Sequence, residues 1–359
     1  MRRSGSIGLL SAAYTVGTAA GMLVPGQAWA AAAPGIILPL MSLPLLLRRR
    51  LAALDPDRAL LLITGLFTLC GIMGAALFRL SPGFSETPSF LADAGESLRG
   101  FIGTLPFSHE GTAPLLTALF TGDRSGLGRE TVRLFRSSGA SHILALSGLH
   151  MGILYLIFDR LSSLAGKSRG VLIVRFILIT AGALTFTLVT GAPPSLVRAF
   201  LFIAINETLR LLGRPRNGVR VLSLALLVQL IISPGVILQP GFQLSYLAMC
   251  GIFILYPRME AWYPEGGRFS PLRTIWKSAA LSISCQLFTA PLVWYYFRSF
   301  PQYFLLTNLL AMPLTTLIMT TALACMVLSA AGICPAFLYT TTDALCTWLQ
   351  GVLEIISSM

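Results

Sequence analysis

Charged residues are scarce in this sequence. They make up 11% of its 359 residues, whereas a soluble domain carries about 25%. Hydrophobic residues make up 55%, and they gather in segments of roughly 20 residues, which is long enough to cross a bilayer. This composition excludes an ordinary soluble domain and predicts an all-α fold, a polytopic transmembrane helical bundle.

Patterns for metal binding and disulfides are also missing. The six cysteines are scattered, mostly within apolar segments, and no CxxC pair or Cys/His ligand spacing occurs. We therefore expect neither disulfides nor a bound metal. The cysteines are Cys70, Cys250, Cys285, Cys325, Cys334 and Cys346.

Familiar catalytic and nucleotide-binding signatures are absent as well. The sequence has no GxxxxGKS/T phosphate-binding loop, no HExxH zinc motif and no GxSxG nucleophile elbow. We therefore assign no catalytic residue and no cofactor. Any transport by this chain would draw its energy from a partner.

About eleven apolar segments are predicted to span the membrane. The first two, 7–24 and 28–47, are interpreted as a retained hairpin rather than a cleaved signal peptide ending near Ala30, because a second apolar segment follows at once. We divide the chain into three N-terminal transmembrane helices (1–78), an outer region (79–141) and a transmembrane core (142–359). The other expected spans are 59–78, 141–158, 171–190, 195–213, 219–235, 242–257, 276–296, 303–330 and 335–357.

The outer region is predicted to contain an amphipathic helix that lies on the membrane surface. Further on, three arginines spaced i, i+4 and i+7 share one helix face, and Asp123 or Ser125 is expected to cap that helix. Together with Arg124 these residues form a basic outer surface. The apolar stripe comprises Phe90, Leu91, Ala94, Leu98, Phe101 and Ile102, and the three arginines are Arg129, Arg133 and Arg136.

The distribution of basic residues predicts the orientation of the chain in the cytoplasmic membrane. With the N-terminus in the cytoplasm, 17 of the 26 basic residues fall in inside loops and seven fall outside. This asymmetry follows the positive-inside rule. It places the C-terminus and the 79–141 region outside.

Polar residues interrupt the apolar segment that follows the outer region. His142, Ser147 and His150 fall within about 140° of one face if the segment is helical throughout. One interpretation is a packing seam, in which Gly148 and Gly152 admit another helix and the polar groups are satisfied locally. The other is a polar face turned toward a water-filled lumen. From these residues alone, the two interpretations have similar weight.

The segment TGAPPSLVRAF places an arginine one turn inside the next span. Pro193-Pro194 breaks the preceding helix, and Ser195 is expected to cap the one that follows. Arg198 either reaches out to lipid phosphates or points into a lumen to meet a passing anion. These alternatives are about equally weighted.

Two later blocks carry more polar groups inside apolar spans. Gln243 and Ser245 follow a Pro-Gly pair, and Gln286 and Asn308 are expected, with nearby prolines, to break their helices. Gln243 and Ser245 either make interhelical hydrogen bonds or line a polar path. The carbonyls that the prolines free are tolerable where they are buried in protein or line water. The aromatic run at 294–296 is interpreted as a membrane-interface belt, about twice as strongly as a surface for stacking bases.

Four blocks, in this order, resemble the competence domain of ComEC-type proteins. They are LFTGDRSGLGRETVRLFRSSGASHILALSGLHMGIL, TGAPPSLVRAFLF, PGFQLSYLAMCGIFIL, and QLFTAPLVWYYF with NLLAMP, and the resemblance covers roughly residues 110–330. That family is regarded as the inner-membrane channel through which one DNA strand enters during natural transformation.

The resemblance implies which residues shape the path. Asp123 and Arg124 would hold the outer turn, and Arg129, Arg133 and Arg136 would form a basic entrance. The residues implied to face or shape the channel are His142, Ser147, Gly148, His150, Ser195, Arg198, Gln243, Ser245, Gln286 and Asn308.

The resemblance also implies partners and shows departures. Full-length relatives usually carry an OB-like outer domain and many a metallo-β-lactamase-like domain. Here about sixty residues fill the outer region, and no HxHxDH motif occurs before Met359, so we expect no nuclease activity. Gln239 stands where relatives often have an acid. The expected partners are single-stranded DNA, membrane lipid, an outer DNA receptor, a cytoplasmic DNA translocase and a separate nuclease.

Two alternatives to a DNA channel are weighed. A permease for a smaller solute would use the same lumen. An intramembrane hydrolase would use Ser147 and His150, which are three residues apart, but no positioned carboxylate follows from the sequence. The favoured prediction is a channel for single-stranded DNA rather than an enzyme.

Overall fold

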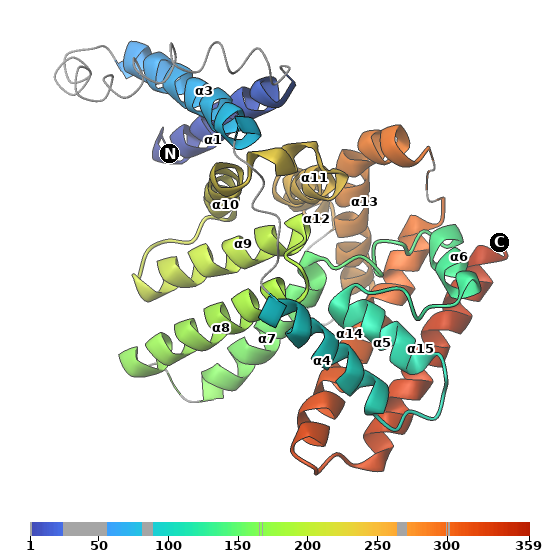
Figure 1. Ribbon diagram of the computed structural model, residues 1–359. Helices are drawn as coiled ribbons and strands as arrows, with labels where there is room; N and C mark the ends of the chain where they lie inside the picture. The colour runs from blue at the N-terminus through green and yellow to red at the C-terminus, as the bar shows by residue number, and fades with distance from the viewer. Residues whose placement is uncertain are drawn as a thin grey trace. The chain divides into compact units, whose positions relative to one another are not determined.

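The fold is known from a computed structural model that describes residues 2–23, 56–80, 89–164, 166, 168–263, 271–298, 300 and 302–359. In these residues every regular element is a helix (Figure 1). The prediction of an all-α fold is therefore confirmed for this part of the chain. The expected span 28–47 lies outside the described residues.

Most predicted helices are present, with shifted ends. The first seven helices are α1 (Arg2–Leu23), α3 (Pro56–Leu80), α4 (Ser89–Thr104), α5 (Thr112–Thr121), α6 (Arg129–Ser137), α7 (Gly148–Leu164) and α8 (Arg169–Val189). The others are α9 (Pro194–Leu211), α10 (Gly218–Ile232), the 3₁₀ helix η2 (Pro234–Leu238), α11 (Pro240–Ile254), α12 (Tyr256–Glu260), α13 (Pro271–Phe297), α14 (Phe304–Ala330) and α15 (Ala336–Ser357).

Two of these helices, α8 and α14, are long and apolar enough to cross a membrane. Shorter apolar helices occur at Ile7–Leu23, Ile63–Arg79, Thr112–Thr121, Gly218–Ile232 and Pro240–Ile254. The predicted number of about eleven spans is therefore not established by helix length and composition.

The chain forms two compact units. Unit 1 comprises residues 1–86 and 201–243, and unit 2 comprises residues 87–200 and 244–359. The boundaries fall inside α9 and α11, so both units are built from segments far apart in the sequence. They do not coincide with the predicted divisions at 78 and 141, which remain an expectation about membrane topology.

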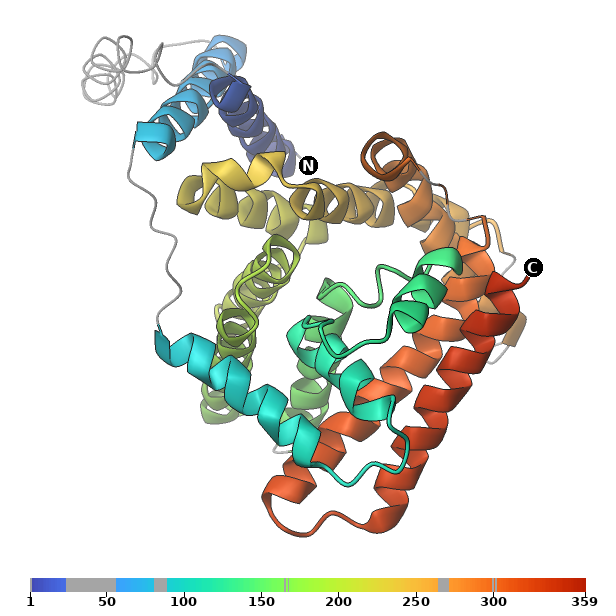
Figure 2. The same ribbon diagram turned by 45° about the vertical axis from the view of Figure 1, so that its right-hand side comes forward.

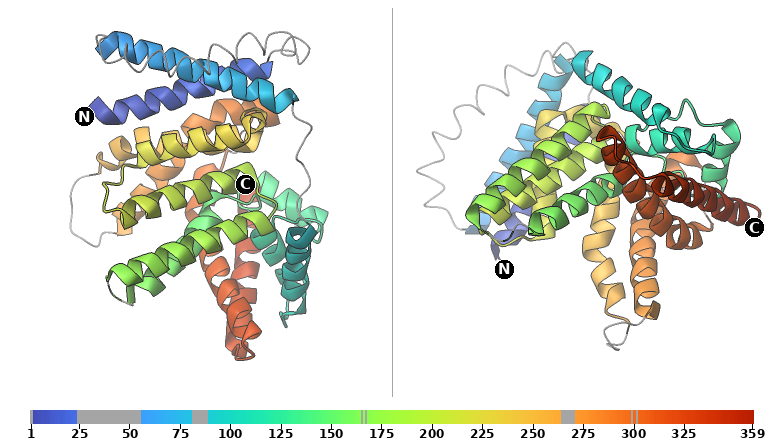
Figure 3. Two further views of the ribbon diagram at one scale, coloured as in Figure 1. Left: turned by 60° about the vertical axis from the view of Figure 1, so that its left-hand side comes forward. Right: turned by 90° about the horizontal axis from the view of Figure 1, so that it is seen from below.

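In unit 1, α1 crosses α3 at close range (Figure 3, left). Gly17 and Gly71 permit this approach, because a Cβ added at Gly17 would overlap Thr68 O and one added at Gly71 would overlap Tyr14 O. Small residues at helix crossings allow backbones to pack directly, which is a common basis of helix association in membranes.

This crossing gives a matched pair of variants. Gly17→Leu is expected to separate α1 from α3, because overpacking a close contact costs about 1–3 kcal/mol. Gly65→Leu in α3 is expected to be almost neutral, because nothing lies within 4 Å of an added Cβ there. Thermal unfolding in detergent measures both, and equal loss of stability in the two variants would contradict the close crossing.

The helices α5, α14 and α15 contribute much of the apolar core of unit 2. Leu115 and Leu119 of α5, Ile318 of α14 and Leu349 of α15 are fully buried in one apolar cluster. Figure 2 shows α14 and α15 side by side as an antiparallel pair. Gly122 ends α5 in the left-handed region, with φ 75°, a conformation that glycine adopts without a steric penalty.

A buried ion pair joins α7 to α8 in unit 2. Arg175 is 4% exposed and pairs with Asp159. Its guanidinium also donates to Ser162 Oγ at 3.1 Å and to Tyr155 OH at 3.3 Å. The Asp159 carboxylate and the two hydroxyl groups therefore compensate the buried positive charge of Arg175, which apolar surroundings would otherwise disfavour.

Several sequence predictions about where helices begin and where they break are wrong. The span predicted at 141–158 starts at Gly148 in the structure, so His142 and Ser147 precede the helix and share no helical face with His150. The helices α13 and α14 continue through Pro291 and Pro313, which were expected to break them. A helix tolerates proline when neighbouring groups satisfy the backbone carbonyl that it frees.

Candidate functional site

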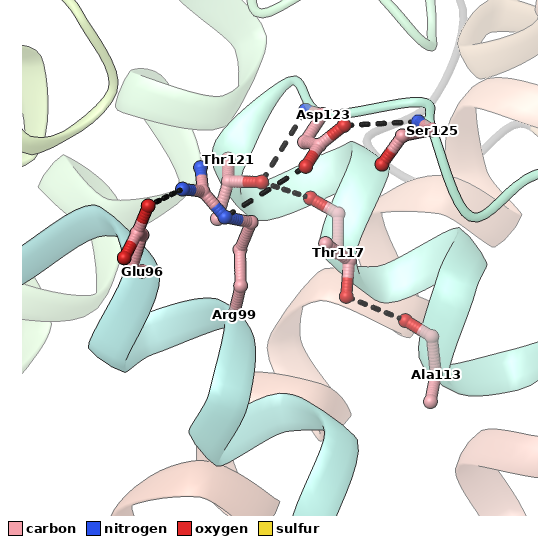
Figure 4. A network of polar contacts seen from close by, with 7 residues as sticks. All are labelled: Glu96, Arg99, Ala113, Thr117, Thr121, Asp123 and Ser125. Atoms are coloured by element: carbon pink, nitrogen blue, oxygen red, sulfur yellow. Dashed lines mark hydrogen bonds and ion pairs between the residues drawn. The ribbon is translucent and has the colours of Figure 1, made fainter. Parts of the chain in front are cut away.

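A polar network fixes the turn between α5 and α6 (Figure 4). Asp123 Oδ1 accepts from Ser125 N at 2.9 Å, and Asp123 N donates to Thr121 Oγ1 at 3.3 Å. Arg99 of α4 reaches across to Asp123, with Nε 3.7 Å from Oδ2, and also lies 3.9 Å from Glu96. The turn between α5 and α6 is thus tied to α4.

The same contacts favour the ionised form of Asp123. The Ser125 N–H, together with the Ser125 hydroxyl and the Arg99 charge, holds the pKa of Asp123 below its ordinary value. The expectation that Asp123 or Ser125 caps α6 is wrong, because Gly128 is the N-cap residue and makes no side-chain cap bond. The Asp123 carboxylate is already engaged within its own turn.

The basic surface predicted on the outer region is present on α6. Arg129, Arg133 and Arg136 are exposed, while Phe135 on the opposite face is fully buried. Arg124 is exposed too, and its Nε donates to Leu144 O at 3.3 Å. Exposed guanidinium groups keep their charge in water and can bind phosphates reversibly.

The end of α6 leads directly to His142, whose side chain is exposed. Thr307 Oγ1 of α14 donates to Ser138 O at 2.6 Å. The His142 ring lies 3.2 Å from Gly139 O through Nδ1, and the Asn308 side chain is within hydrogen-bonding reach of the ring. The turn after α6 therefore places His142 beside α14.

Ser147 and His150 form a reciprocal cap at the start of α7. Ser147 Oγ accepts from Leu149 N at 3.3 Å, and Ser147 N donates to His150 Nδ1 at 3.2 Å. This resembles a capping box, with histidine in the place usually held by glutamate or glutamine, except that the serine accepts from the second rather than the third N–H of the helix. His150 is fully buried, and no partner for its Nε2 occurs among the described residues.

The same geometry bears on the hydrolase alternative. Ser147 Oγ lies 3.1 Å from His150 Nδ1, as a nucleophile and base would. A triad also needs an acid that orients the histidine, and none pairs with His150 in the part of the chain that the structure describes. The cap accounts for the contact without a catalytic role.

The start of α9 docks against the start of α7. Ser195 lies inside the first turn of α9, which begins at Pro194, so it is not the predicted cap; its hydroxyl donates to Leu146 O at 2.7 Å. One turn further on, Arg198 Nη2 lies 3.1 Å from where a Cβ at Gly148 would stand. Gly148 thus makes room for a guanidinium, while Gly152 faces open space.

Two further helices contribute to the surroundings of Arg198. Its guanidinium carbon lies 6.0 Å from the ring centroid of Tyr246 on α11, and Cys285 on α13 is also close to it. Cys285 Sγ lies 3.9 Å from Ala248 O, which brings α13 against α11. Ser245 and Gln286, the neighbours of Tyr246 and Cys285 in the sequence, are half-buried.

Four of the seven buried side-chain polar atoms without partners among the described residues belong to predicted residues, and the other three belong to Thr112, Arg220 and Asp343. Among the described residues, such atoms include His150 Nε2, Arg198 Nε, Gln286 Nε2 and Asn308 Oδ1. Most buried polar groups in proteins have partners, so each exception calls for an explanation. A polar occupant of this part of unit 2 would supply partners for them.

Not every predicted site residue joins this cluster. Gln243 belongs to unit 1, where its Nε2 donates to Ile237 O at 2.7 Å. The aromatic residues Trp294, Tyr295 and Tyr296 are exposed at the end of α13. That exposure suits both a membrane belt and a stacking surface, so the two interpretations stay open.

No role was assigned from the sequence to four residues that the structure places in contact with, or close to, charged groups. Tyr246 lies within the third block, and Cys285 directly precedes the fourth, but neither was singled out, since both residue types are common in apolar helices. Arg99 and Asp159 are ordinary charged residues until their partners in space are known. The described residues hold no cluster of three His, Cys, Asp or Glu side chains suited to a metal.

A family model and two curated relatives match this chain. A family model described as "Competence protein" matches residues 119–359. The ComE operon protein 3 of Bacillus subtilis (strain 168) is 25% identical over 252 residues, which cover 68% of this chain and 30% of that protein. The uncharacterized protein YcaI of Escherichia coli (strain K12) is 27% identical over 228 residues, 61% of this chain and 29% of that protein.

The matched part of the chain thus spans less than a third of the length of either relative. No solved structure matches the chain significantly.

Proposed function

This chain belongs to the competence protein family, and we propose on that basis that it conducts single-stranded DNA inward across the cytoplasmic membrane during natural transformation. In this proposal the chain spans the membrane many times, with its N-terminus in the cytoplasm and its C-terminus outside. An outer DNA receptor, a cytoplasmic DNA translocase and a separate nuclease would work beside it.

The observation that carries the proposal is the gathering of polar groups inside an apolar unit. Arg198 and His150 are buried, each with an unpartnered nitrogen, and Gln286 and Asn308 also hold unpartnered atoms. Buried polar groups in a membrane protein usually line a substrate path or pair with one another. A phosphate backbone with a shell of water would supply partners to all four.

The exposed arginines of α6 suit the outer end of such a path. Arg129, Arg133 and Arg136 stand in water, where they would attract a polyanion without sequence preference. The turn that precedes them, between α5 and α6, is fixed by Asp123 and Arg99. The proposal therefore assigns capture to α6 and conduction to the residues beyond His142.

Uptake of labelled DNA tests the proposed function. A deletion strain would be complemented with wild type, Arg198→Ala or His150→Ala, with protein abundance measured in each. Losing the charged Arg198 side chain or the hydrogen-bonding His150 side chain from the path is expected to reduce uptake about 10- to 100-fold. Arg160→Gln, an exposed change on α7, serves as the control and is expected to retain uptake.

If the deletion leaves uptake intact, the DNA channel is wrong and a permease for a smaller solute becomes the better proposal. If wild type restores uptake but both site variants match it at equal abundance, the path does not run past Arg198 and His150.

A further inference from the structure

The first turn of α9 contacts the residues just before α7, within unit 2. Ser195, in the first turn of α9, bonds to Leu146 O at 2.7 Å, and Leu146 is two residues before α7 begins. The N-terminus of a helix carries a partial positive charge of about half a unit and N–H groups without acceptors in the helix. The starts of α7 and α9 therefore add their positive ends at one point, although Ser147 Oγ already accepts the N–H of Leu149 and Pro193 O accepts those of Leu196 and Val197.

Arg198 adds a full charge to that point. It is 8% exposed, and its Nη2 stands 3.1 Å from the Cβ position of Gly148, the first residue of α7. Its Nε has no partner among the described residues. The side chains that act electrostatically on the guanidinium are chiefly Tyr246 and Cys285, and neither is a carboxylate.

A buried guanidinium between two helix N-termini is unfavourable until an anion joins it. Helix N-termini bind phosphate groups through their N–H donors, and arginine matches the oxygens of a phosphate with two parallel hydrogen bonds. We propose that Arg198 and the N-termini of α7 and α9 form a binding site for one phosphodiester group.

The occupant is assigned as a phosphodiester of the transported strand, and this assignment rests on the proposed function. The chemistry is shared with phospholipid headgroups. The burial of Arg198 and of His150 in the first turn of α7 favours a strand within the unit over a lipid at its surface. A single site of this kind would hold each phosphate in turn and release it, as conduction requires.

Inorganic phosphate provides the direct test on the full chain purified in detergent. Phosphate is expected to raise the melting temperature of the wild type above that in chloride of equal ionic strength. In Arg198→Gln the concentration of phosphate needed is expected to rise about tenfold or more, since a charged hydrogen-bonding partner is lost. Equal stabilisation of both proteins would overturn the site.

Two further variants serve as controls for this measurement. Arg160→Gln, exposed on α7, is expected to respond like the wild type, which separates a local site from general screening. Arg198→Lys retains charge but loses the planar pair of donors, so it is expected to bind phosphate more weakly than wild type. If Arg198→Gln does not fold, as its melting in chloride would show, an unchanged phosphate response in Arg198→Lys would overturn the site.

A deoxythymidine dodecamer and its uncharged methylphosphonate analogue identify the occupant. Binding of the dodecamer that weakens in Arg198→Gln, with no binding of the analogue, supports the strand. If phosphate stabilises the wild type but the dodecamer does not bind, the site stands and the DNA function fails. If Arg198→Gln instead loses co-purified phospholipid while dodecamer binding is unchanged, the site belongs to lipid and the assignment to the strand is overturned.

Discussion

Breaking the ion pair between Asp159 and Arg175 is expected to destabilise unit 2 strongly. Asp159→Leu would leave the Arg175 guanidinium, 4% exposed, without its carboxylate. Removing one partner of a buried pair costs about 3–5 kcal/mol. We expect the lower end, about 3 kcal/mol, because the Asp159 side chain is 33% exposed and water screens part of the interaction.

The double variant separates charge from packing. Asp159→Leu/Arg175→Leu removes both charges, and replacing a whole buried pair with apolar groups is often neutral or stabilising. It should therefore recover most of the stability lost in Asp159→Leu. Thermal unfolding in detergent and abundance in the membrane measure the effect, and a double variant as unstable as the single one would contradict a charge-based cost.

Gly148→Leu is expected to reduce DNA uptake about tenfold or more, through the position of Arg198. A side chain at Gly148 would occupy the space of the guanidinium, whose Nη2 is 3.1 Å from an added Cβ. Overpacking of this kind costs about 1–3 kcal/mol, or about 5- to 150-fold in an equilibrium that depends on the displaced group. At Gly152, one turn along α7, an added Cβ has nothing within 4 Å, so Gly152→Leu is expected to retain uptake.

A double-mutant cycle shows whether Gly148 acts through Arg198. If Gly148→Leu matters only because it displaces the guanidinium, it should add little to the loss already caused by Arg198→Ala. Losses that multiply would indicate an independent role for Gly148 in packing. Equal losses in Gly148→Leu and Gly152→Leu would contradict the contact with Arg198 altogether.

Two predictions from residue spacing, one correct and one wrong, show when a sequence pattern predicts a shared helix face. The i, i+4, i+7 spacing of Arg129, Arg133 and Arg136 predicts one helix face, and the three side chains are exposed on α6. The spacing of His142, Ser147 and His150 predicts a shared face and is wrong, because Ser147 caps α7 and ends the helical register before His142. Periodicity describes a helix only within its own ends.

Helix ends depend on which of several possible hydrogen bonds a polar side chain makes, and the local sequence does not determine that choice. Asp123, Ser125 and Ser195 are all residue types that cap helices. In the structure Asp123 bonds to Ser125 N, and Ser195 bonds to Leu146 O, 49 positions away in the chain. Each polar side chain has several acceptors or donors within reach, and tertiary packing selects among them.

By itself, the sequence determined the all-helical class, the positions of most helices and the set of polar residues that apolar segments disfavour. These follow from composition and from local periodicity, which every short segment carries on its own. Only the tertiary structure decided that Arg198 stands over Gly148, that Arg175 pairs with Asp159, and that the starts of α7 and α9 coincide. Such contacts join residues far apart in the chain, and the packing of whole helices decides which of them meet.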